Sequence, residues 1–132
     1  IVSQDSHYRD AEQRLQQLQS SIKIDQAWNS GEKAYQEKRW TDAISYYETV
    51  RSIDDTYHHD ELQQHLYVCY LNQGKELLQR RPADTNTPKE AYNLLRRALQ
   101  VKPRDPEATT WRNYARDYSR GYTAFSQQQW QR

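Results

Sequence analysis

The chain has 132 residues, a formal net charge of +1 and a mean hydropathy of -1.28. Its length suits one small domain, and its nearly balanced charge disfavours broad, charge-driven association with nucleic acid. Eleven Tyr and four Trp are present, whereas only three Gly and four Pro interrupt the chain. Large amphipathic rings can build a core in a very polar chain, so the composition indicates helices rather than disorder.

The first segment is expected to be a helix from Ser6, which can serve as its N-cap, after a frayed lead-in at residues 1–5. Its apolar residues share one narrow face: Ala11, Leu15, Leu18 and Ile22. A narrow face suits a capping helix or a segment that packs on a missing neighbour. We expect this helix to continue into the next segment without a break at Ser20.

The next stretch, residues 24–57, predicts two helices folded back on each other. Apolar or small residues at i, i+4, i+7 and i+11 form the first stripe: Ile24, Trp28, Gly31 and Tyr35. Thr41 is the expected N-cap of the second helix, which ends near Ser52. The second stripe consists of Ala43, Tyr47 and Val50, with Ile44 and Ile53 beside them. Neither helix can bury its stripe alone.

The same spacing recurs downstream, which is typical of a repeat architecture. The later first-helix stripes are Tyr67, Leu71, Gly74 and Leu78, then Tyr114, Tyr118, Gly121 and Phe125. The later second-helix stripe is Ala91, Leu95, Ala98 and Val101. The stretch from Gly121 to Trp130 also matches the stretch from Gly31 to Trp40, which places Trp130 where a further second helix would begin.

The remaining boundaries follow from turn and cap residues. A helix is expected from about His59 to Arg80, followed by a turn-rich insertion at residues 81–88. Thr87 can cap the helix that Pro88 opens. Asp105 and Pro106 repeat this arrangement at the start of the last helix.

These small and aromatic positions resemble the tetratricopeptide repeat (TPR) family over about residues 24–132. The residues that carry the resemblance are Gly31, Ala34, Tyr35, Ala43, Tyr47 and Val50, and later Gly74, Ala91, Leu95, Ala98 and Pro103. The chain departs from the family pattern in its longer period, in the position of Trp28 and Tyr118, and in Asp55, where the family has proline. The resemblance implies a scaffold that binds other proteins, and it implies no chemistry.

We therefore expect an all-α, TPR-like α-solenoid of antiparallel helix pairs. Residues 1–23 form an N-terminal capping or extended helix, 24–57 repeat 1, 58–105 repeat 2 with the insertion at 81–88, and 106–132 the first helix of a truncated repeat 3. The chain lacks Met and begins with Ile1. It is expected to be a piece of a larger protein, which we expect to be bacterial.

Catalytic and metal-binding motifs are weak in this sequence. It contains no nucleophile elbow, glycine-rich phosphate loop or zinc-helix motif. His58, Glu61 and His65 are suitable metal ligands, but they lack the i, i+4 histidine pair that grips zinc. We expect no enzyme activity, no metal and no cofactor. Cys69 is the only cysteine, which excludes an internal disulfide and favours a buried free thiol.

Charge is unevenly distributed, with about -5 on residues 1–73, +5 on 74–104 and +1 on 105–132. The basic part includes Lys89, Arg96 and Arg97 on the outer face of a second helix, where nucleic acid or anionic lipid could bind. A solvated face is the simpler reading, so no nucleic acid partner and no direct membrane insertion are expected. No apolar run reaches the length of a membrane span. The expected location is the cytoplasm or the soluble extracytoplasmic part of a membrane-anchored protein.

The first helices of a TPR array line its concave groove, so the resemblance implies a protein or peptide partner there. The expected groove residues are Trp28, Glu32, Tyr35, Leu71, Asn72, Lys75, Tyr118 and Tyr122, with Leu78 and Phe125 in or just beneath the surface. These positions also belong to the packing stripes, so the core is the alternative place for most of them. Only Asn72 matches the family's carboxylate clamp, which disfavours a C-terminal carboxylate as the ligand.

Two further hypotheses remain open. The last unit lacks its second helix, so Phe125 and Trp130 could form an apolar edge through which two copies associate. The other hypothesis is a structural spacer that holds a further domain away from a membrane or an enzyme. A binding module needs an open groove, whereas a spacer does not.

Overall fold

The computed structural model describes residues 2–79 and 86–130, and within them the side chains of residues 6–79 and 86–121. All regular structure in this part of the chain is α-helical. The five helices are α1 (Val2–Gln36), α2 (Trp40–Ile53), α3 (His59–Gln79), α4 (Asn86–Val101) and α5 (Pro106–Trp130). The expected fold class, an all-α array of paired helices, is confirmed.

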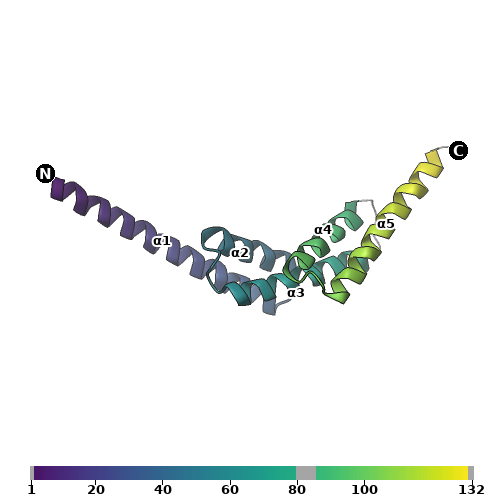
Figure 1. Cartoon of the computed structure of the whole chain (residues 1–132), viewed down its shortest axis with the longest axis horizontal. Coiled ribbons are helices and arrows are strands. Elements are labelled where there is room, and N and C mark those ends of the chain that lie inside the picture. Colours follow the sequence, from purple (N-terminus) through teal and green to yellow (C-terminus); the bar gives the residue numbers. More distant parts are fainter. Residues whose placement is uncertain (1, 80–85, 131–132) are drawn as a thin grey trace.

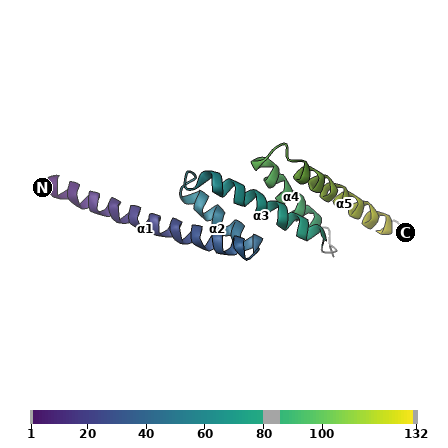
Figure 2. The same cartoon turned by 90° about the horizontal axis from the view of Figure 1, so that it is seen from below.

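The helices form an elongated array in which each one packs against the next along the chain, while α3 also contacts α5. Figure 1 shows a shallow arch with the two termini at opposite ends, and in Figure 2 neighbouring helices run back and forth. The N-terminal part of α1 projects beyond the array in both views. The array therefore leaves long helix surfaces without a neighbour.

Of the stripes predicted for the first two units, Ile53 is 37% exposed, Tyr35 and Val101 are half-buried, and the other members form the core. In repeat 1 these are Ile24, Trp28, Ala34, Ala43, Ile44, Tyr47 and Val50, and in repeat 2 they are Tyr67, Leu71, Leu78, Ala91, Leu95 and Ala98. Leu62, Leu66, Cys69 and Tyr70 join the same core from α3. The sequence therefore predicted the inward faces of the first four helices.

Two glycines allow paired helices to approach closely. A Cβ at Gly31 would stand 2.8 Å from Cε1 of Tyr47, and one at Gly74 would stand 2.8 Å from Cγ of Leu95. At Gly121 a Cβ would meet nothing within 4 Å, because no helix of the described residues packs there. The first two units are therefore closed pairs, and the third presents a single helix.

The described part of the stripe in the last unit, which consists of Tyr114, Tyr118 and Gly121, is only partly covered. Tyr114 is 50% exposed, and α5 contacts the array through Ala108, Trp111 and Ala115 instead. Helix α5 continues as far as Trp130, so no second helix begins at the position that the match to Trp40 indicated. Residues 127–129 are all Gln, a good helix former, so nothing in this stretch stops the helix.

Tyrosine hydroxyls and carboxylates connect neighbouring elements. Tyr47 of α2 donates a hydrogen bond to Glu32 of α1 at 2.7 Å, and Tyr70 of α3 donates to Glu48 of α2 at 2.9 Å. Tyr67 likewise donates to Asp105, which precedes α5. A buried ring with a satisfied hydroxyl explains how a polar, tyrosine-rich sequence can form a packed core.

The turn between α1 and α2 differs from the prediction. Lys38 has a φ of 60°, its N–H donates to the carbonyl of Tyr35, and the N–H of Arg39 donates to the carbonyl of Ala34. This is a Schellman motif, which ends α1 and lets α2 begin at once. Arg39 therefore occupies the N-cap position, without a side-chain cap, and Thr41 lies inside the helix. The Thr41 prediction is wrong.

The other predicted caps have mixed outcomes. Asp105 accepts a hydrogen bond from the N–H of Ala108 at 2.9 Å, which confirms it as the N-cap of α5. Thr87 lies within α4, which begins at Asn86, so it is not a cap. Helix α1 begins at Val2, which places Ser6 within the helix and removes the predicted lead-in. Most of the insertion at 81–88 lies outside the described residues.

Candidate functional site

The predicted groove residues of α1 surround His65 of α3. The Nδ1 atom of His65 lies 2.7 Å from Oε1 of Glu32 and 3.1 Å from the hydroxyl of Tyr47. The ring of Tyr35 stacks on His65, with centroids 4.3 Å apart and an interplanar angle of 18°. Sequence spacing did not single out His65 as a centre of contacts, because Glu32 lies 33 residues away along the chain.

This cluster places a carboxylate, an imidazole and a hydroxyl within hydrogen-bond distance, an arrangement that can activate a nucleophile. However, the hydroxyl of Tyr47 is buried and donates to Glu32. Burial, followed by that hydrogen bond, raises the pKa of Tyr47 far above its ordinary value. The hydroxyl is therefore held protonated, and the contacts favour a structural junction between α1, α2 and α3.

Trp28 belongs to the packing around the same junction. It is 8% exposed, and its ring stacks on His58 with centroids 4.5 Å apart. His58 precedes α3 and has a φ of 44°, so it does not share a regular helix face with Glu61 and His65. Among the residues that the structure describes, no three His, Cys, Asp or Glu side chains are placed to hold a metal ion.

A second group of predicted residues lies where α3 meets α5. Lys75 of α3 forms an ion pair with Glu107 at 2.8 Å, and its Nζ lies 5.6 Å from the ring centroid of Trp111. Asn72 donates a hydrogen bond to the carbonyl of Val68, one turn earlier. The sequence did not single out Trp111, because only tertiary packing brings it to Lys75.

The predicted groove set therefore separates into three parts. Leu71 and Leu78 are core residues, as Trp28 is. Glu32, Tyr35, Asn72, Lys75 and Tyr118 are partly exposed. The side chains of Tyr122, Phe125 and Trp130 lie outside those that the structure describes. We use the name α1–α3–α5 face for the surface of Glu32, Tyr35, His65, Asn72, Lys75 and Trp111.

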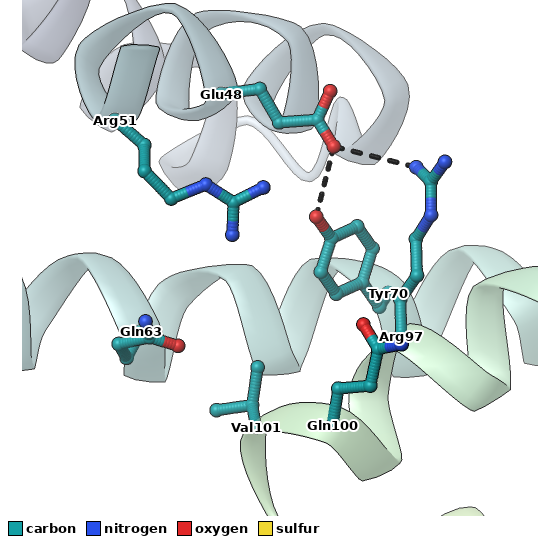
Figure 3. Close-up of a pocket in the computed structure, with 7 residues that line it drawn as sticks. All are labelled: Glu48, Arg51, Gln63, Tyr70, Arg97, Gln100 and Val101. Carbon is teal, nitrogen blue, oxygen red and sulfur yellow. Dashed lines mark hydrogen bonds and ion pairs between the residues drawn. The ribbon is translucent and has the colours of Figure 1, made fainter. Parts of the chain in front are cut away.

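A polar hollow lies between α2, α3 and α4 (Figure 3). It encloses about 450 Å³ and is lined by Glu48, Arg51, Gln63, Tyr70, Arg97, Gln100 and Val101. Because residues two apart in a helix point to nearly opposite sides, Gln63 lies across α3 from His65. The hollow and the α1–α3–α5 face are thus on opposite sides of α3.

The charges in the hollow are only partly paired. Oε1 of Glu48 accepts a hydrogen bond from Tyr70 and lies 3.4 Å from Nη1 of Arg97 (Figure 3). Burial, followed by the bond to Glu48, raises the pKa of Tyr70 to about 12. Arg51 extends into the same space, and within the described part of the chain no hydrogen bond or ion pair holds it. The hollow can therefore accept an anionic group.

Comparisons of this chain with family models, with curated proteins and with solved structures find no match. In the described residues, no helix combines the length and the apolar character that crossing a membrane requires.

Proposed function

We propose that this chain is a non-catalytic protein-interaction module of the TPR type, which holds a peptide segment of another protein on the α1–α3–α5 face. One observation carries the proposal: partly exposed side chains of α1 and α5 each meet a partly exposed side chain of α3. Tyr35 of α1 stacks on His65 of α3, and Lys75 of α3 lies 5.6 Å from the ring centroid of Trp111 of α5. The sequence resemblance to TPR arrays, in which the first helix of each pair lines the binding surface, supports the same assignment.

The chemistry of this face defines the ligand it fits. Glu32 already accepts a hydrogen bond from Tyr47, and Lys75 is already paired with Glu107. Because both charges have partners within the chain, the exposed parts of the rings supply most of the new contact area. We therefore expect a peptide whose aromatic or aliphatic anchor residues provide most of the affinity. Lys75 and Glu32 contribute to specificity, by favouring an acidic and a basic group beside them.

The proposal is tested by selecting ligands from a displayed library of random peptides on the immobilised protein. The affinity of an enriched peptide is then measured by calorimetry for the wild type and for two variants of the face, Tyr35→Ala and Lys75→Glu. The matched control is Lys89→Glu, which makes the same charge change at an exposed position on α4.

We expect Tyr35→Ala and Lys75→Glu to weaken binding about tenfold each, the loss of a typical interface anchor, while Lys89→Glu leaves it unchanged. Binding that survives both variants but is lost in Arg51→Glu would move the site to the polar hollow. Enrichment of no peptide would contradict the proposal.

A structural spacer is the second candidate, and one observation favours it. The array is elongated and its termini lie at opposite ends (Figure 1). A spacer needs no ligand, so it predicts that the peptide selection yields no specific sequence. The two candidates therefore differ in the result of the same experiment.

A further inference from the structure

The N-terminal half of α1 carries a second apolar stripe that no part of the array covers. Its members are Tyr8, Ala11, Leu15, Leu18 and Ile22. The intervals between them are three, four, three and four residues, which is the heptad spacing of a coiled coil. In this register Tyr8, Leu15 and Ile22 occupy a positions, and Ala11 and Leu18 occupy d positions.

These side chains are exposed to a degree that is unusual for large apolar residues. Tyr8 is 67% exposed, Leu15 56%, Leu18 58% and Ile22 48%. Every other residue in the range 6–23 is exposed as well. A helix with no packed face is marginally stable in water, so this segment gains stability when a partner covers the stripe.

The stripe faces away from the array. Ile22 and Ile24 are two residues apart, which places them about 200° apart around the helix. Ile24 is only 6% exposed because it packs in the core. The side of α1 that continues the core face toward the N-terminus is polar, with Gln13, Gln16 and Gln17 beside Tyr57 and the end of α2. A partner on the stripe would not compete with α2 or α3.

We propose that the stripe from Tyr8 to Ile22 is a homodimer interface, in which the N-terminal halves of α1 from two copies of this chain pair as a short, parallel, in-register coiled coil. The proposal rests on one structural feature: the heptad stripe lies on the side of α1 opposite to the side that packs against its own array. Two copies can therefore pair through it while the two arrays point outward, without collision.

The polar flanks of the stripe fit a second copy of the same helix. In the parallel arrangement a residue at g lies next to the e residue of the following heptad in the other helix. His7 at g then meets Glu12 of the second copy, and Arg14 meets Gln19. No like charges face each other. Asp25, the next d residue, accepts a hydrogen bond from the hydroxyl of Tyr57 in its own array, so the pairing ends after Ile22.

Light scattering of the full chain across concentrations tests this interface. The wild type should shift from 15.9 kDa to twice that mass as concentration rises. The double variant Leu15→Glu/Leu18→Glu should remain at 15.9 kDa. The control Gln16→Glu/Gln17→Glu places the same charges on the other side of the same helix turns, and it should dimerise like the wild type.

Cysteine cross-linking checks the orientation without disrupting the stripe. In a parallel pair, Ala11→Cys places two thiols face to face at a d position and should give a disulfide-linked dimer on oxidation. Gln16→Cys should give none. Cys69 is buried in the core and does not interfere.

Three outcomes would overturn the proposal. A wild type that stays monomeric at all concentrations would show that something other than a second copy covers the stripe. A double variant that still dimerises would place the interface elsewhere, for example on the C-terminal helix. A dimer that Ala11→Cys does not cross-link would contradict the parallel, in-register arrangement.

Discussion

Gly74 of α3 lies directly against Leu95 of α4, so closely that a Cβ at Gly74 would stand 2.8 Å from Cγ of the leucine. Leu95 is fully buried in the core. This contact fixes the spacing between the two helices of the second unit. Gly31 and Tyr47 form the corresponding contact in the first unit.

Replacing Gly74 by Ala should therefore destabilise the protein. The methyl group overpacks the contact with Leu95 by roughly 1–3 kcal/mol, which exceeds the gain of about 1 kcal/mol that Ala brings to a helix. The matched control is Gly121→Ala, because nothing lies within 4 Å of the added group there. That variant should gain stability. Urea unfolding gives the free energy of unfolding of both variants. Equal changes in the two variants would contradict the close packing of Gly74 against Leu95.

The hydroxyl of Tyr47 should contribute to stability through its bond to Glu32. Tyr47→Phe keeps the ring in the core but removes the bond to Glu32, which among the described residues then keeps only His65 as a partner. We expect a loss of about 1 kcal/mol. Tyr46→Phe is the control, since Tyr46 is the neighbouring residue and is exposed. Chemical denaturation of the two variants gives the comparison. A stability loss of the same size in both would assign no role to the bond.

Asp105 should make the stability depend on pH. Its bond from Tyr67, followed by the bond from the N–H of Ala108, lowers the pKa of this carboxyl in the folded state. The stabilisation is therefore complete above the ordinary aspartate pKa of about 4 and is lost as the pH falls through the lower folded value. In thermal unfolding, the wild type should have a higher melting temperature than Asp105→Asn at pH 6. This difference should disappear below pH ~4.

A difference in melting temperature between the two proteins that stays constant from pH 6 to pH 3 would contradict this account of Asp105. The control for this series is Asp10→Asn, at an exposed position on α1 far from the turn that opens α5. Its melting temperature should match that of the wild type at every pH.

Cys69 should report on unfolding. It is fully buried, and burial, followed by the charge of Glu32, raises the pKa of its thiol to about 12. Because the thiolate is the reactive form, a thiol reagent at pH 8 should modify the native protein slowly and the urea-unfolded protein at once. Absorbance of the released chromophore follows the reaction. Fast modification without denaturant would show that the junction between α1 and α3 opens readily.

Much of the fold could be predicted because its signal is local. The stripes through Trp28, Tyr47, Leu71 and Leu95 follow from helical periodicity, and each of these residues is buried. The turn at Lys38 could not be predicted, because a Schellman motif is usually marked by glycine and here uses a lysine with a positive φ. In the last unit, Tyr114 is 50% exposed because the described residues hold no second helix that could cover it.

The candidate site was less predictable for the same physical reason. Glu32 and Lys75 could be assigned to one side of the array from their register. Their partners, His65 and Glu107, depend on how one helix is rotated against the next. Arg51 faces the polar hollow because α2 and α4 lie on the same side of α3.

The most direct test of the central claim is a nuclear magnetic resonance titration of the labelled protein with a peptide obtained from the selection. We predict that the largest shifts fall on the indole N–H of Trp111 and on the amides around Tyr35, Asn72 and Lys75, while those around Arg51 and Arg97 stay unchanged. Shifts confined to the polar hollow, or none on α1, α3 and α5, would contradict binding on the α1–α3–α5 face.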